Sequence, residues 1–154
     1  MFLPEIREKS LKTVKVTSTL EEGFRVITKA RKHVIVQDLP EFAGGKDAGP
    51  LPPELLLASL AGCIGIVARY HSRKFGIEIK GMEIEVEGDY DPRGFAGQDV
   101  KPGFQEIRVR AVIDAPGASE EDLKKLMEFV EKHCPIEDTL VDTTKVVVKV
   151  EKKV

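Results

Sequence analysis

The sequence predicts a single α+β domain with the element order βββ-α-ββ-α-β and a buried central helix. Three observations lead to this fold class. Short runs with alternating apolar residues recur on both sides of one long apolar stretch, and an amphipathic stretch follows near the C-terminus. A length of 154 residues suits one domain over residues 1–154, with residues 1–11 as an N-terminal extension. A chain of this size needs no disulfide or metal to fold.

The first quarter of the chain predicts three strands. Residues 12–19 and 23–29 alternate and are rich in β-branched side chains, and the turn residues between them predict a hairpin. Residues 33–37 form the third predicted strand. Prolines and glycines over residues 40–53 then predict a long loop, and long loops in compact domains are often functional.

The central helix is predicted to begin at Pro52 and Pro53 and to run to about Phe75. Proline suits the first helical turn, and Gly76 suits the C-cap. From Leu55 to Ala68 the helix is apolar on every face, which is typical of a core helix. This apolar stretch is shorter than the roughly 18–20 residues that span a bilayer, so no membrane segment is expected.

The second half of the chain predicts three more strands and one helix. Residues 77–87 and 104–114 alternate between apolar and polar side chains, as a strand with one wet face does. Ser119 and Asp122 approximate a capping box at the start of a helix that ends near Pro135. Residues 143–151 alternate again and form the last predicted strand.

The composition excludes several classes of protein. The 24 Lys and Arg residues nearly cancel the 26 Asp and Glu residues, which argues against nucleic-acid and membrane-surface partners. The first twelve residues lack the apolar region of a signal peptide, so a cytoplasmic protein is expected. The absence of asparagine and the abundance of Glu and Lys are typical of a thermophile.

The two cysteines are the main candidates for chemistry. Cys63 lies within the apolar helix beside Gly62 and Gly65, whose lack of side chains allows a second surface to approach the sulfur. Cys134 lies at the end of the later helix. Both residues could be small buried hydrophobes, which is common for free cysteine. If the two helices pack together, the thiols could instead form a disulfide, which needs Cα atoms within about 7 Å.

Two other kinds of site lack their sequence patterns. The histidines His33, His71 and His133 do not form an H-x3–5-H pair, and the cysteines do not form a C-x2-C pair, so no zinc site is expected. The glycines of residues 44–49 lack the G-x4-G-K-[ST] pattern of a phosphate loop. No metal and no cofactor are therefore predicted.

Around the cysteines the sequence resembles the OsmC/Ohr family, named for osmotically inducible protein C and organic hydroperoxide resistance protein. The resemblance rests on residues 53–63, which end in Gly-Cys, and on the later Cys-Pro-Ile at residues 134–136. It extends over residues 12–151. The resemblance implies an OsmC-like fold, an intertwined homodimer and a thiol-dependent peroxidase that reduces organic hydroperoxides or hydrogen peroxide without a metal or flavin.

The resemblance also implies the roles of the cysteines. Cys63 attacks the peroxide and becomes a sulfenate, and Cys134 resolves it as a Cys63–Cys134 disulfide. This order of steps agrees with thiol chemistry, in which a nearby thiol condenses with a sulfenic acid before further oxidation. A small dithiol, lipoyl-type in some members, then reduces the disulfide.

A glutamate that orients an activating arginine is also expected, and Glu54 is the candidate. Family members have this glutamate one position earlier, where this chain has Pro53. One position turns a helical side chain by about 100°. Glu54 is also a favourable acid at a helix N-terminus, so a purely structural role is an alternative.

The activating cation is not identified by the sequence. Residues 39–51 contain no arginine, which leaves Arg25, Arg31 or Lys46 as candidates, or none of them. The alternative function is therefore a non-catalytic redox sensor or a small apolar ligand-binding dimer of the same fold.

Overall fold

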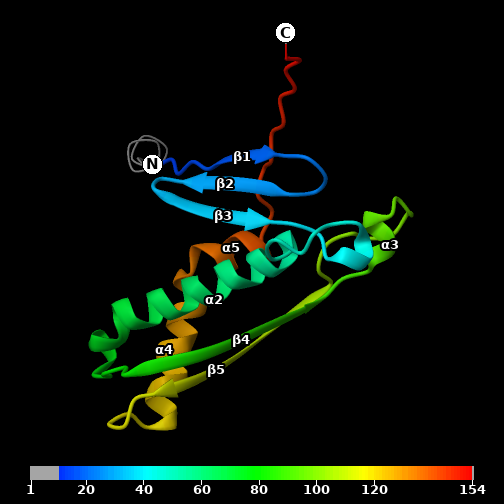
Figure 1. The fold of residues 1–154 in the computed structure, drawn as a ribbon. Coiled ribbons are helices and arrows are strands. Elements are labelled where there is room, and N and C mark those ends of the chain that lie inside the picture. The colour runs from blue at the N-terminus through cyan, green and yellow to red at the C-terminus, as the bar shows by residue number, and fades with distance from the viewer. Residues whose placement is uncertain (1–10, 154) are drawn as a thin grey trace, which may run out of the picture. The chain divides into compact units, whose positions relative to one another are not determined.

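The computed structural model describes residues 11–153, so the N-terminal extension lies outside the described residues except for Leu11. The chain forms two compact units that divide between Leu55 and Leu56. Figure 1 shows the elements in chain order. They are β1 (Thr17–Leu20), β2 (Val26–Ala30), β3 (His33–Gln37), the 3-10 helix η1 (Glu41–Ala43), α2 (Pro52–His71), the 3-10 helix η2 (Ser72–Phe75), β4 (Gly81–Asp89), α3 (Pro92–Phe95), β5 (Glu106–Asp114), α4 (Glu120–His133) and α5 (Pro135–Val141).

In the first unit the predicted hairpin and the predicted third strand form one antiparallel sheet, β1-β2-β3. Thr17 of β1 pairs with Lys29, one residue before β2 ends at Ala30. Arg31 then has a φ of 55°, in the tight turn that leads to β3. The predicted first strand, residues 12–19, therefore begins too early, because only Ala30 remains in β2 beyond Lys29 and residues 12–15 have no partners there.

The long loop after β3 is held by a buried carboxylate. Asp38 is 3% exposed and accepts hydrogen bonds from the backbone N–H groups of Leu39, Lys46 and Ala48 at 2.7, 3.1 and 3.2 Å. Burial raises the pKa of Asp38, but these amide donors and the charge of Arg25 outweigh it and hold the pKa below its usual value. The glycine-rich segment is therefore folded around a carboxylate rather than open to a phosphate.

Gly45 in this loop is a position where any side chain collides with the backbone. A Cβ there would lie 1.9 Å from the carbonyl oxygen of Leu39 and 2.8 Å from Oδ1 of Asp38. We expect Gly45→Ala to lower the free energy of unfolding by about 3 kcal/mol, measured by urea denaturation. The matched control is Gly117→Ala, since a Cβ at Gly117 meets no atom within 4 Å. Equal unfolding midpoints for the two variants would contradict this assignment.

The second unit contains the antiparallel pair β4–β5. The ladder runs from Gly81 opposite Asp114 to Asp89 opposite Glu106. The predicted strand 77–87 begins too early, because the apolar alternation changes phase at Gly81. Ile77 and Ile79 precede the strand and are buried in the core instead.

The core of the second unit joins α2 to α4. One stripe of α2 (Leu60, Ile64 and Ala68) is buried, as are Leu126 and Val130 of α4. The capping box predicted at Ser119 is confirmed. The backbone N–H of Asp122 donates to Oγ of Ser119 at 3.1 Å, and the backbone N–H of Ser119 donates to Asp122 at 3.2 Å.

The central helix is less buried in this chain than its sequence predicts. Ile66 and Tyr70 of α2 are 72% and 79% exposed. The helix therefore has more apolar side chains than the rest of the same chain covers. By length and composition the span Pro52–Phe75 could also cross a membrane, contrary to the expectation from its shorter apolar stretch. This is a weak indication, because core helices of other proteins satisfy the same criterion, and the buried stripe of α2 is the pattern of a core helix.

The C-terminal region differs most from the prediction. Pro135 ends α4 as predicted, but it also begins α5, because proline at the first position of a helix loses no hydrogen bond. The strand predicted over residues 143–151 does not pair with any strand in the described part of the chain. These residues leave α5 as an extended segment (Figure 1). A strand forms only where its backbone N–H and C=O groups pair with a neighbouring edge, so the alternation of these residues does not by itself make them a strand.

Candidate active site

Cys63 lies on α2 at the border of the buried stripe. Its side chain is partly exposed and packs against the core of the second unit. The adjacent Gly62 is open, because a Cβ there would meet no atom within 4 Å. The sulfur of Cys63 is thus placed on a rigid helix, with one side against the core and with little steric cover from its helical neighbour.

Cys134 lies between α4 and α5 and is fully buried, with 0% exposure. It is the C-cap of α4 and the N-cap of α5. Its Sγ accepts a hydrogen bond from the backbone N–H of Glu137 at 3.4 Å. Pro135, with its fixed φ, sets the direction of α5 and so helps to place this amide.

The structure brings the two cysteines together within the second unit. Burial raises the pKa of the Cys134 thiol, and the adjacent Cys63 side chain raises it further. Backbone amides of Glu137 and Ile136 act in the opposite direction and are outweighed. Both cysteines are free thiols. The Cys63 side chain therefore lies close enough to Cys134 to act on the pKa of its thiol.

Aromatic and histidine side chains pack beside the C-terminal end of α4. The rings of Phe129 and His133 stack with centroids 3.9 Å apart, and His71 meets Phe129 edge-on at 4.8 Å. Burial lowers the pKa of His71, and the charges of Lys74 and His133 lower it further. Residues 11–153 contain no group of three or more His, Cys, Asp or Glu side chains arranged to hold a metal ion.

Glu54 belongs to the first unit, whereas both cysteines belong to the second. It lies exposed in the first turn of α2, and its Oε2 accepts a hydrogen bond from the backbone N–H of Leu51 at 2.7 Å. The structure therefore gives Glu54 a local role at the start of the helix. Its catalytic role stays a prediction.

The candidate cations also lie in the first unit. Arg25 forms an exposed ion pair with Glu21 at 3.6 Å. Arg31 occupies the tight turn between β2 and β3, and the backbone of Lys46 is tied to Asp38.

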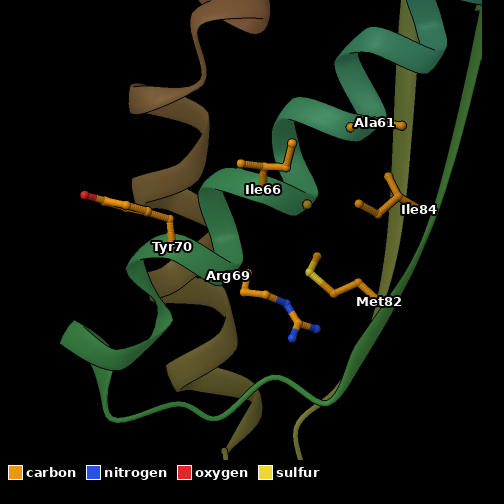
Figure 2. A pocket seen from close by; sticks show the side chains of 8 residues that line it. Ala61, Ile66, Arg69, Tyr70, Met82 and Ile84 are labelled. Carbon is orange, nitrogen blue, oxygen red and sulfur yellow. The ribbon is translucent and has the colours of Figure 1, made fainter. Parts of the chain in front are cut away.

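A groove beside α2 was not found by sequence reasoning. Its volume is about 590 Å³, and Figure 2 shows Arg69 and Met82 pointing toward the space between α2 and β4 while Tyr70 points away. It is lined by Ala61, Gly62, Gly65, Ile66, Arg69, Tyr70, Met82 and Ile84. The signal for it is the cluster of small residues on one side of an apolar helix, which leaves space against a neighbouring strand.

Comparisons with known proteins agree with this fold. A model of the OsmC-like protein family matches residues 44–151. An OsmC-like protein from Mycoplasma pneumoniae superposes with a TM-score of 0.74 at 26% identity, covering 86% of this chain and 89% of that chain. No curated protein matches the sequence.

Two further solved structures carry functional names. The organic hydroperoxide resistance protein OsmC from Legionella pneumophila has a TM-score of 0.62 at 17% identity, covering 85% of this chain and 90% of its own. The organic hydroperoxide resistance protein OhrB of Bacillus subtilis has a TM-score of 0.58 at 22% identity, covering 87% and 94%. At these identities the two structures establish a shared fold.

Proposed function

We propose that this chain, which belongs to the OsmC-like protein family, is a thiol-dependent peroxidase. Its substrates would be organic hydroperoxides or hydrogen peroxide. The observation that carries the proposal is the meeting of Cys63 and Cys134 in one core. The names of the similar hydroperoxide resistance proteins support the substrate class. The test is consumption of cumene hydroperoxide or hydrogen peroxide by the purified chain with dithiothreitol or dihydrolipoamide as reductant. Absence of turnover with every one of these pairs would contradict the proposal.

In the first step the thiolate of Cys63 attacks the peroxide. A bond forms between sulfur and the terminal oxygen while the O–O bond breaks, and the alcohol or water leaves with a proton. Partial exposure of Cys63 and the open space at Gly62 allow a small peroxide to reach the sulfur. The sulfur is oxidised to a sulfenic acid, and the peroxide is reduced.

In the second step Cys134 attacks the sulfenic sulfur. The sulfur–sulfur bond forms, the sulfenic oxygen leaves as water, and the product is a Cys63–Cys134 disulfide. A small dithiol, such as a lipoyl-type one, then returns both cysteines to thiols by exchange. Neither step requires a metal ion.

Disulfide formation is expected to accelerate with pH. The pKa of Cys134 is raised above its ordinary value, so near neutral pH only a small fraction of this residue is thiolate. Below that pKa the thiolate fraction, and with it the rate of condensation, should rise about tenfold per pH unit. The measurement is rapid acid quenching and mass spectrometry after one equivalent of a fast-reacting peroxide. A condensation rate independent of pH would show that the thiolate of Cys134 is not the attacking group.

Glu54 is proposed as the carboxylate that orients the activating cation. A carboxylate accepts several hydrogen bonds, so the bond from Leu51 leaves capacity for a cation. The candidates for that cation are Arg25, Arg31 and Lys46.

The proposed assembly is a homodimer, located in the cytoplasm, in which the whole chain works as one functional domain. Apolar side chains that one chain leaves uncovered support it. On α2 these include Ile66 and Tyr70, and the extended segment after α5 exposes Val146, Val148 and Val150. A second copy is a partner that could cover both surfaces, and exposed apolar surface of this extent is typical of interfaces.

A second candidate function is a redox sensor or a small apolar ligand-binding dimer. It is favoured by the apolar groove beside α2 and by the engagement of Glu54 with Leu51. Such a protein would form the disulfide but would turn over peroxide slowly or not at all. Repeated peroxide turnover at a rate far above that of the free dithiol alone would support the peroxidase and contradict this second function.

A further inference from the structure

The two sulfurs of the proposed disulfide differ sharply in accessibility. Cys134 is 0% exposed, and it lies in the same buried cluster as Leu126 and Val130, which are also 0% exposed. Cys63 is partly exposed on α2. A reductant from solvent therefore reaches the sulfur of Cys63 without disturbing the core. It reaches the sulfur of Cys134 only if the core opens.

We propose that the reducing thiol attacks the disulfide at the Cys63 sulfur and that Cys134 is the leaving thiolate. The proposal rests on the peroxidase function above and specifies its reductive half. The covalent intermediate is thus a mixed disulfide between the reductant and Cys63.

The geometry of thiol exchange supports this direction. The attacking thiolate approaches a sulfur from the side opposite the leaving sulfur. The sulfur that is more exposed to solvent is therefore the one that is attacked. Cys63 is partly exposed, so part of its side chain can be reached from solvent. Attack on Cys134 would require a path through the side chains that surround it.

A backbone contact of Cys134 also favours its release as a thiolate. The backbone N–H of Glu137 already donates to Sγ of Cys134 at 3.4 Å and can hold a developing negative charge there. Burial nevertheless raises the pKa of Cys134, which slows its departure. Access, rather than leaving-group ability, therefore sets the direction, and the amide limits the cost of a buried thiolate.

The exchange balances in two steps with a dithiol. The first thiolate of the reductant bonds to the Cys63 sulfur, the Cys63–Cys134 bond breaks, and its electron pair stays on Cys134, which then takes a proton. The second thiolate of the reductant attacks the reductant's own bound sulfur and releases Cys63 as thiolate. The reductant leaves as a cyclic disulfide, oxidised by two electrons, and the protein is reduced by two.

The test maps the mixed disulfide on the full chain. The disulfide is formed with diamide, so no peroxidase activity is needed, and then treated briefly with glutathione, a monothiol that cannot complete the second step. Acid quenching, digestion and mass spectrometry locate the adduct. We expect glutathione on Cys63 in at least about tenfold excess over Cys134. A predominance on Cys134, or equal amounts on the two residues, overturns the proposal.

Two controls make the result specific to the fold. Cys63→Ser and Cys134→Ser, each loaded with glutathione, calibrate the detection of the two peptides. The diamide-oxidised protein unfolded in urea should lose the preference, because both sulfurs are then exposed. A preference for Cys63 that persists in urea overturns the argument from access. Failure of diamide to form the Cys63–Cys134 disulfide also overturns the proposal, whatever the peroxide assay shows, whereas a negative peroxide assay with a clear adduct on Cys63 counts against the proposed function alone.

Discussion

Cys63→Ser is expected to lower kcat/KM for hydroperoxide reduction by about 1,000-fold or more. A serine hydroxyl stays protonated near neutral pH and is a poor nucleophile, so the first oxygen transfer does not occur. The measurement is peroxide consumption with a dithiol in excess, corrected for the rate of the dithiol alone. The side chain changes by one atom on the partly exposed border of α2, so the fold should persist. Equal rates for this variant and the wild type would contradict the assignment of Cys63.

Cys134→Ser is the matched control, and its expected behaviour is different. Without a reductant it should consume a first equivalent of peroxide per chain rapidly and further peroxide only slowly, with a sulfenic acid on Cys63 that a sulfenate-specific reagent captures after the first equivalent. Because no second thiol condenses with that group, further peroxide should oxidise Cys63 to sulfinic acid. If Cys134→Ser consumed no peroxide at all, the two cysteines would not have the separate roles proposed for them.

Several features of the fold could be predicted from local pattern. The third strand, the capping box at Ser119 and the end of α4 near Pro135 all depend on residues close in sequence, and all are observed. The meeting of Cys63 and Cys134 depends on how α2 packs against α4. The buried stripes that bring these helices together repeat with helical periodicity, so the sequence contains this information, although the distance between the sulfurs does not follow from it.

The errors have physical causes that a residue pattern does not reveal. The predicted strand 77–87 begins too early because two alternating runs of opposite phase adjoin at Gly81, and only the second run pairs with β5. Proline at position 135 suits both the end of one helix and the start of another, so the pattern predicts the end of α4 but not the start of α5. The groove beside α2 depends on the distance between a helix and a strand, which small residues permit but do not fix.

The extended C-terminal segment leads to the second large expected effect, on assembly. Its alternation places Val146, Val148 and Val150 on one face, with exposures of 82%, 79% and 90%, while Lys145 and Lys149 alternate with them. One apolar face and one mainly charged face are what a strand at the rim of a buried layer requires. In the proposed homodimer a second copy supplies the missing edge and covers the valines.

Replacing all three valines with serine should therefore weaken the dimer strongly. Burial of one valine side chain contributes about 1.5 kcal/mol, so three contribute about 4–5 kcal/mol per copy. That free energy corresponds to at least about a 1,000-fold increase in the dimer Kd. Sedimentation velocity over a series of protein concentrations measures it directly. The expected result is a dimer for the wild type and a monomer for the triple variant at the same concentration.

A control on the other face of the same segment separates burial from a general effect of substitution. Replacing Lys145, Lys149 and Glu151 with serine changes the same number of residues in the same segment, but on the charged face. Its dimer Kd should stay close to that of the wild type, because exposed charges contribute little to the stability of an interface. If the two triple variants weakened the dimer equally, or if neither did, the valine face would not be the dimer contact. Peroxide turnover by the same samples would then show whether the chemistry of Cys63 depends on the second copy at all.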